Sequence, residues 1–189
     1  TFVSNINFNF DIKDQIFNFD NINLRYDNTN FQSKKIRITK SGKIFEVKGD
    51  LSNKKGLIKP NSFSKLVNFN LDFLEKKEIS METENEFSFN INSNRLIKDL
   101  NLKSSLKFDE LYFNKKYQDL IYLEDGVIET EYSNNNLSVE VDSKYSFIED
   151  ESKNVVNDKN DLNLYIVKKN NENIEVKGSL SNNKKTIDP

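Results

Sequence analysis

Residues 79–91 read ISMETENEFSFNI, with apolar side chains at most odd positions and polar side chains at every even position. Side chains of a β-strand point alternately to the two faces of a sheet, so this alternation predicts a strand with one apolar and one polar face. The same period of two runs through most of the chain, including residues 6–12, 22–26, 69–73, 100–108, 128–132, 137–147, 162–166 and 174–180. The sequence therefore predicts an all-β protein whose strands share an apolar face.

Short polar segments separate these stretches at positions that suit antiparallel hairpins. Ser41-Gly42 and residues 133–136 are typical hairpin loops, because glycine and asparagine tolerate a left-handed backbone. The apolar positions change parity between Phe19 and Ile22, which predicts a bulge near residues 20–21. Helical spacing occurs at residues 111–121, where we expect one short helix, and residues 61–66 could form a helical turn.

The composition excludes several classes of site. These 189 residues contain no Cys, His or Trp, and their formal net charge is −2. Disulfides, zinc and haem sites, and catalytic centres built on Cys or His are therefore excluded within them. The longest purely apolar run, residues 120–123, is far too short to span a membrane. The charge balance lacks the basic excess of a nucleic-acid-binding protein, so we expect no nucleic-acid partner.

Clustered carboxylates are the remaining candidates for chemistry. Glu129 and Glu131 alternate with Ile128 and Thr130, so they are typical of a solvated outer face rather than of a converging catalytic pair. Acidic runs at residues 149–151 and 158–161 lack the spacing and the central glycine of an EF-hand calcium loop. We therefore expect no enzyme, no metal site and no cofactor. The charged side chains that we expect on the outer face are Lys34, Glu46, Lys48, Glu129, Glu131, Glu140 and Lys177.

The chain contains an internal repeat. Residues 45–60 read FEVKGDLSNKKGLIKP and residues 174–189 read IEVKGSLSNNKKTIDP, with ten of the sixteen positions identical and an offset of 129 residues. A duplication explains this identity better than chance, and repeated units bury their faces against neighbours. We therefore expect residues 1–189 to be one segment of a larger array with a period of 129 residues.

The apolar face of such a sheet has to be covered. The sequence offers no long amphipathic helices, so a second sheet, closure into a barrel or an apolar ligand remain. A sheet of this size usually curls or splits. We expect a long, curled antiparallel sheet that forms an elongated hydrophobic groove and is built from repeats.

At the repeat, the motif V-x-G-x-L-x-N falls on Val47, Gly49, Leu51 and Asn53, and again on residues 176–182. With the long run of alternating strands, it resembles the AsmA-like proteins of the YhdP and TamB type, which are bacterial bridge-like lipid transfer proteins. The resemblance implies a periplasmic β-groove that carries phospholipid or other acyl lipid between inner and outer membranes. It also implies an inner-membrane anchor outside these residues.

On this interpretation the acyl chains lie on one set of apolar side chains. The expected lipid-binding residues are Phe69, Leu71, Phe73, Phe87, Phe89, Ile91, Leu102, Leu106, Phe108, Val139, Val141 and Phe147. The alternative is a structural extracellular β-repeat, such as an adhesin or stalk, in which the same side chains fill closed sandwich cores.

Overall fold

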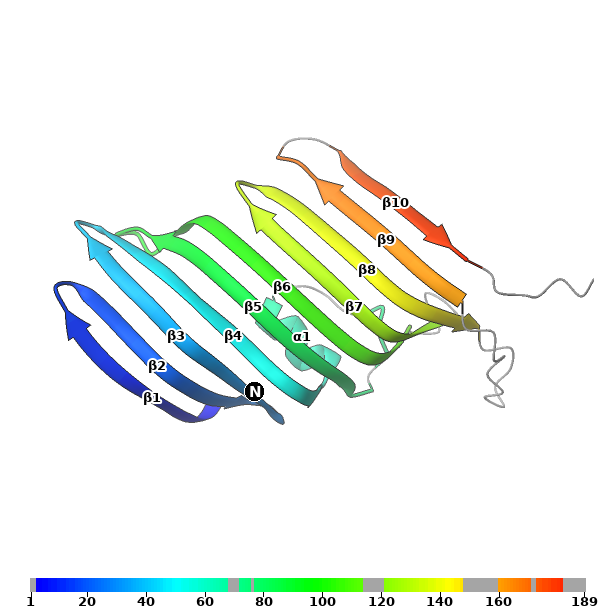
Figure 1. Ribbon diagram of the computed structural model, residues 1–189, viewed down its shortest axis with the longest axis horizontal. Coiled ribbons are helices and arrows are strands. Elements are labelled where there is room, and N and C mark those ends of the chain that lie inside the picture. Colours follow the sequence, from blue (N-terminus) through cyan, green and yellow to red (C-terminus); the bar gives the residue numbers. More distant parts are fainter. Residues whose placement is uncertain are drawn as a thin grey trace, which may run out of the picture.

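The computed structural model describes residues 3–67, 72–75, 77–113, 121–147, 160–170 and 173–181. These ranges form ten strands and one helix, shown in Figure 1. In chain order they are β1 (Val3–Lys13), β2 (Ile16–Tyr26), β3 (Thr29–Ser41), β4 (Ile44–Ile58), α1 (Pro60–Val67), β5 (Ile79–Ile91), β6 (Ile97–Tyr112), β7 (Ile121–Ser133), β8 (Asn136–Phe147), β9 (Asn160–Lys168) and β10 (Ile174–Leu180).

The ten strands form a single antiparallel sheet in which spatial order equals chain order, from β1 at one edge to β10 at the other. The prediction of a long antiparallel sheet is confirmed. The sheet twists but is neither closed nor strongly curled (Figure 1), so the pronounced lengthwise curl that we expected is not present. Ten strands are near the limit that twisted open sheets reach before they curl or split.

Bulges keep the apolar side chains on one face despite parity changes in the sequence. The bulge expected near residues 20–21 is present, because Asn21 has a φ of 55° and the register of β2 with β1 shifts between the pairs Asn9↔Asp20 and Asn7↔Asn23. In β3 the register with β4 shifts between Gln32 and Ile36. The Asp50 carboxylate accepts hydrogen bonds from the backbone N–H groups of Lys34 (2.9 Å) and Lys35 (3.1 Å) at this shift.

The two helix predictions have different outcomes. The turn expected at residues 61–66 is confirmed as part of α1. The helix expected at residues 111–121 is wrong where the structure describes it, since β6 extends to Tyr112 and β7 begins at Ile121. Tyr112 lies opposite Tyr122 and their rings stack with centroids 5.4 Å apart. Cross-strand pairing therefore overrides the helical spacing, as tertiary contacts often override local pattern.

The hydrophobic core lies on one half of the apolar face of the sheet. Ile58 of β4, Met81 of β5 and Phe108 of β6 are only 1%, 4% and 3% exposed. Leu74, in the segment that follows α1, packs against this cluster. The Tyr26 hydroxyl donates a 2.9 Å hydrogen bond to the Ser62 carbonyl and so ties the start of α1 to the end of β2.

A glycine makes room for Phe108, the least exposed aromatic side chain of this core. A Cβ at Gly126 of β7 would lie 1.9 Å from Cζ of Phe108, so the phenyl ring occupies the space above the glycine. Aromatic rings often cover a cross-strand glycine in this way.

Candidate functional site: an apolar face in two parts

The cross-strand register assigns one continuous apolar face to the whole sheet. Residues directly opposite each other in antiparallel strands point to the same side. One row of directly opposed residues crosses all ten strands, namely Phe10, Phe19, Ile36, Gly49, Phe87, Leu102, Tyr132, Leu137, Lys168 and Ile174. All but Gly49 and Lys168 are apolar or aromatic, so the apolar surface runs at right angles to the strands and along the sheet.

Part of this face has no second layer among the described residues, and we call it the open stripe. It comprises Phe17, Phe19, Ile36, Ile38, Val47, Phe87, Phe89, Leu102, Val139 and Ile166. These side chains are half-buried, apart from Val47, which is 6% exposed. They shield one another laterally: the rings of Phe87 and Phe89 stack with centroids 6.0 Å apart. Within the described ranges, the residues packed above the sheet, such as Leu74, lie over the core instead.

A chain of polar side chains runs along the border between the core and the open stripe. We call it the polar belt and define it as Asn53, Thr83, Asn85 and Ser104. Ser104 Oγ donates to Asn85 Oδ1 (2.7 Å), Asn85 Nδ2 to Thr83 Oγ1 (3.3 Å), and Thr83 Oγ1 to Asn53 Oδ1 (2.6 Å). Asn53 Nδ2 then donates to the Met81 carbonyl at 2.9 Å. The hydroxyls and amides of the belt thus partner one another, which makes them tolerable on an apolar face.

The expected lipid-binding residues do not all lie together. Phe87, Phe89, Ile91, Leu102, Val139 and Val141 lie on the part of the face above or beside the polar belt, and all are half-buried. Leu106 packs against the core, and Phe108 is inside it. Phe73 lies in the segment before β5 and stacks on Phe113, with centroids 6.3 Å apart. Phe69, Leu71 and the side chain of Phe147 lie outside the described residues.

The opposite face of the sheet is polar, as the alternation predicts. Glu46 and Lys48 of β4 form an ion pair (2.7 Å) there, and Lys103 of β6 reaches Glu131 of β7 (3.2 Å). Lys55 Nζ lies 2.6 Å from the Asp109 carboxylate and so bridges β4 and β6 across β5. This charge-assisted hydrogen bond raises the pKa of Lys55 and lowers that of Asp109.

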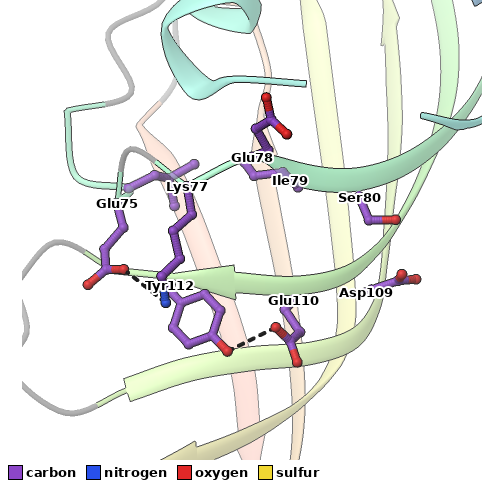
Figure 2. Close-up of a pocket in the computed structure, with 9 residues that line it drawn as sticks. Glu75, Lys77, Glu78, Ile79, Ser80, Asp109, Glu110 and Tyr112 are labelled. Atoms are coloured by element: carbon purple, nitrogen blue, oxygen red, sulfur yellow. Dashed lines mark hydrogen bonds and ion pairs between the residues drawn. The ribbon is translucent and has the colours of Figure 1, made fainter. Parts of the chain in front are cut away.

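A cleft of about 290 Å³ opens where β5 and β6 meet the segment that follows α1 (Figure 2). Its lining residues are Leu74, Glu75, Lys77, Glu78, Ile79, Ser80, Asp109, Glu110 and Tyr112. Lys77 Nζ lies 3.8 Å from the centroid of the Tyr112 ring and 3.5 Å from the Glu75 carboxylate. The Lys77 ammonium group in the cleft is therefore paired with a carboxylate and an aromatic face, which is a stabilising surface arrangement.

The tyrosine in this cleft has a raised pKa. Burial, and then the hydrogen bond that its hydroxyl donates to Glu110 (2.9 Å), raise the pKa of Tyr112 to about 12. A tyrosine serves as a base or nucleophile when its pKa falls toward neutrality. Within the described ranges no group of three or more acidic side chains is placed to hold a metal ion. Residues 149–151, 158 and 159, weighed as calcium ligands, lie outside those ranges.

Three comparisons with known proteins found no match. No family model matches the chain, and no curated protein and no solved structure is similar to it. Among the described residues, no helix is both long and apolar enough to cross a membrane.

Sequence reasoning missed the polar belt. The signal was available in residues 79–91, where Thr83 and Asn85 interrupt the apolar positions of the strand. Ser104 interrupts residues 100–108 in the same way. Only the register shows that these interruptions fall side by side, since Asn85 lies opposite Ser104 and Asn53 opposite Thr83.

Proposed function

We propose that this chain binds lipid, with acyl chains lying on the open stripe. The observation that carries the proposal is the continuity of the stripe. Aromatic and aliphatic side chains, most of them half-buried, follow one another from β2 to β9, with no second layer among the described residues. An apolar surface of this extent is typical of an interaction site rather than of a face left to solvent.

The chemistry requires no reacting group. Each methylene removed from water gains about 0.8 kcal/mol, so an apolar stripe substitutes for the bilayer interior. Because similar side chains recur from strand to strand, a chain that slides along the sheet exchanges one contact for an equivalent one. The polar belt on one side, with Ser104 and Asn85 half-buried, provides hydrogen-bonding groups near which the polar end of a lipid can lie.

The likeness of the repeated motif to AsmA-like proteins supports a more specific role. On this proposal the chain is a segment of a periplasmic bridge whose β-groove carries phospholipid between inner and outer membranes. Attachment to the membranes, including the inner-membrane tether, is then made by regions outside these residues. Among the described residues the open stripe has no second layer, which suits a segment of such a bridge.

The test replaces Phe89 of the open stripe by Asp. An ionised carboxylate against acyl chains is strongly disfavoured by desolvation. The matched control is Tyr165→Asp on the polar face of β9, where the side chain is 44% exposed. Lipid in the purified protein is measured by mass spectrometry, and a photo-crosslinking residue at position 89 or 165 reports contact with acyl chains.

We expect the wild type and Tyr165→Asp to carry lipid and the folded Phe89→Asp variant to lose it. Crosslinks to lipid should form from position 89 and not from position 165. A wild type that carries no lipid and takes none from phospholipid vesicles would overturn the proposal. The structural β-repeat, such as an adhesin or stalk, would then be the better interpretation.

A further inference from the structure

The two edge strands of the sheet expose apolar side chains that the inner strands shield. On β1, Phe8 and Phe10 are 49% and 50% exposed, and on β10, Ile174 and Val176 are 60% and 59% exposed. No described strand pairs with the outer edge of either β1 or β10. Such an edge is a template for pairing with another strand.

Strand β10 reproduces β4 in detail. Both carry the sequence Glu-Val-Lys-Gly, and the ion pair Lys48–Glu46 recurs as Lys177–Glu175. A Cβ at Gly49 would meet the Ile36 side chain at 2.9 Å and the Lys35 carbonyl at 3.1 Å, both on β3. A Cβ at Gly178 would meet the equivalent two groups on β9, the Leu164 side chain at 3.1 Å and the Asn163 carbonyl at 3.0 Å.

The two glycines differ on the other side. The space beside Gly49 is closed by the Phe87 ring of β5, which lies 3.1 Å from the position of a Cβ. The third nearest described atom to the corresponding position at Gly178 again belongs to Leu164, at 3.8 Å. Gly178 therefore has the environment that β3 gives Gly49 and lacks the aromatic ring that β5 supplies.

Strand β1 carries the side chains that β5 presents to β4. Residues 8–12 read FNFDI and residues 87–91 read FSFNI, with Phe, Phe and Ile at the same spacing. In β5, Phe87 lies opposite Gly49, Phe89 opposite Val47 and Ile91 opposite Phe45.

We propose that β10 of one copy of this chain pairs with β1 of a second copy, in the register that β4 and β5 use within one copy. Phe8 of the second copy then lies opposite Gly178, Phe10 opposite Val176 and Ile12 opposite Ile174. The Phe8 ring fills the space that the Phe87 ring fills beside Gly49. The inference concerns the two edges of the sheet, rests on the fold and holds whether or not the stripe binds lipid; in a longer array of such units the same register would join neighbouring units of one chain.

The directions of the strands agree with this pairing. In a meander alternate strands run the same way, so β10 is parallel to β4 and β1 is parallel to β5. The β10–β1 pair is consequently antiparallel. The free edge of β10 lies on the side away from β9, just as the edge of β4 that pairs with β5 lies on the side away from β3. The apolar faces of the two copies therefore lie on the same side of the combined sheet. The interface is head-to-tail and generates an open-ended assembly.

Cysteine pairs test the register directly, because the chain has no natural cysteine. By analogy with Lys48↔Ser88 and Glu46↔Asn90, the matched pairs are Lys177→Cys with Asn9→Cys, and Glu175→Cys with Asp11→Cys. These four residues are exposed and belong to the polar face. The mismatched controls are Lys177→Cys with Asp11→Cys, and Glu175→Cys with Asn9→Cys. The two matched pairs are two residues apart on one face, so they share one type of cross-strand pair, and the Cα separation of about 4.5 to 5.5 Å in either type is within the range that a disulfide spans.

Each single-cysteine protein is mixed with its partner under mild oxidation, and linked dimers are quantified on non-reducing gels. We expect each matched pair to give roughly tenfold more dimer than either mismatched pair. Equal yields from matched and mismatched pairs would overturn the proposed register.

Sedimentation tests the assembly without cysteines. The wild-type chain should form species that grow with concentration beyond a dimer. Phe8→Asp should abolish this growth, whereas Leu57→Asp, which removes an equally exposed apolar side chain (49%) from inner strand β4, should retain it. A wild type that stays monomeric at high concentration, or equal effects of the two variants, would overturn the proposed contact.

Discussion

Replacement of Phe108 by Ala should destabilise the protein far more than the same change at Phe89, although both were expected on one groove floor. Phe108 is 3% exposed, its ring covers Gly126, and it packs in the cluster that contains Ile58 and Met81. Truncation of a buried phenylalanine costs about 3 to 5 kcal/mol of unfolding free energy, because a cavity remains. Phe89 is half-buried and borders the open side, so its truncation loses part of the burial energy and should cost about 1 kcal/mol.

The assay is urea unfolding of lipid-free protein, followed by far-ultraviolet circular dichroism. The free energies are compared at equal slopes of the transition, so that the difference reflects stability rather than a change of the unfolded state. Equal losses for Phe108→Ala and Phe89→Ala would show that both side chains lie in one closed core. The division of the apolar face into a core and an open stripe would then be refuted.

Gly126 provides the complementary perturbation at the same contact. A Cβ at this position would be 1.9 Å from the Phe108 ring, so Gly126→Ala must displace the ring and should destabilise the wild type. In the Phe108→Ala background the methyl group has room, and the same change should cost little. We expect a coupling energy in the range of about 0.5 to 3 kcal/mol, as for residues in contact. Additive effects would contradict the placement of the ring over the glycine.

Two further predictions concern the polar belt and the tyrosine cleft. Asn53→Ala should lower the free energy of unfolding in urea by about 2 to 3 kcal/mol, because it leaves the Thr83 hydroxyl and the Met81 carbonyl without their Asn53 partner. Ser104→Ala, at the half-buried end of the belt, should cost less; an equal loss of stability would contradict the belt. Tyr112 should ionise near pH 12, above its ordinary pKa of 10.0, in ultraviolet titration at alkaline pH, and Tyr112→Phe should remove a late-ionising phenol. Because the folded-state pKa is raised, the stability that the protonated phenol contributes is complete below about pH 10 and is lost as the pH rises through about 12. Ionisation of every tyrosine near pH 10 would contradict this environment.

The alternation of apolar and polar residues was sufficient to predict the class of fold and the two faces. Side-chain direction in a strand has a fixed period of two, so Glu46 and Lys48 had to lie opposite Val47 in any sheet. The bulge at Asn21 was predictable for the same reason, because a change of parity with one apolar face requires an extra residue. Strands prevailed at residues 111, 112 and 121, where helical spacing was misleading, because Leu111 and Tyr112 gain cross-strand partners that the local sequence does not show.

The tertiary structure decided which apolar side chains are covered. Phe87, Phe89 and Phe108 carry the same period-two signal, and the sequence gives no means of ranking their burial. The difference arises because Leu74 packs over the part of the apolar face that contains Phe108, and because Gly126 leaves space there for a ring. The polar belt likewise depends on register between β4, β5 and β6, which a single strand does not encode. The period of two in the sequence fixes the face on which a side chain lies. Whether other residues pack over that face depends on segments that are distant in the chain. The sequence therefore determined the sheet, and only the fold determined where its apolar face stays open.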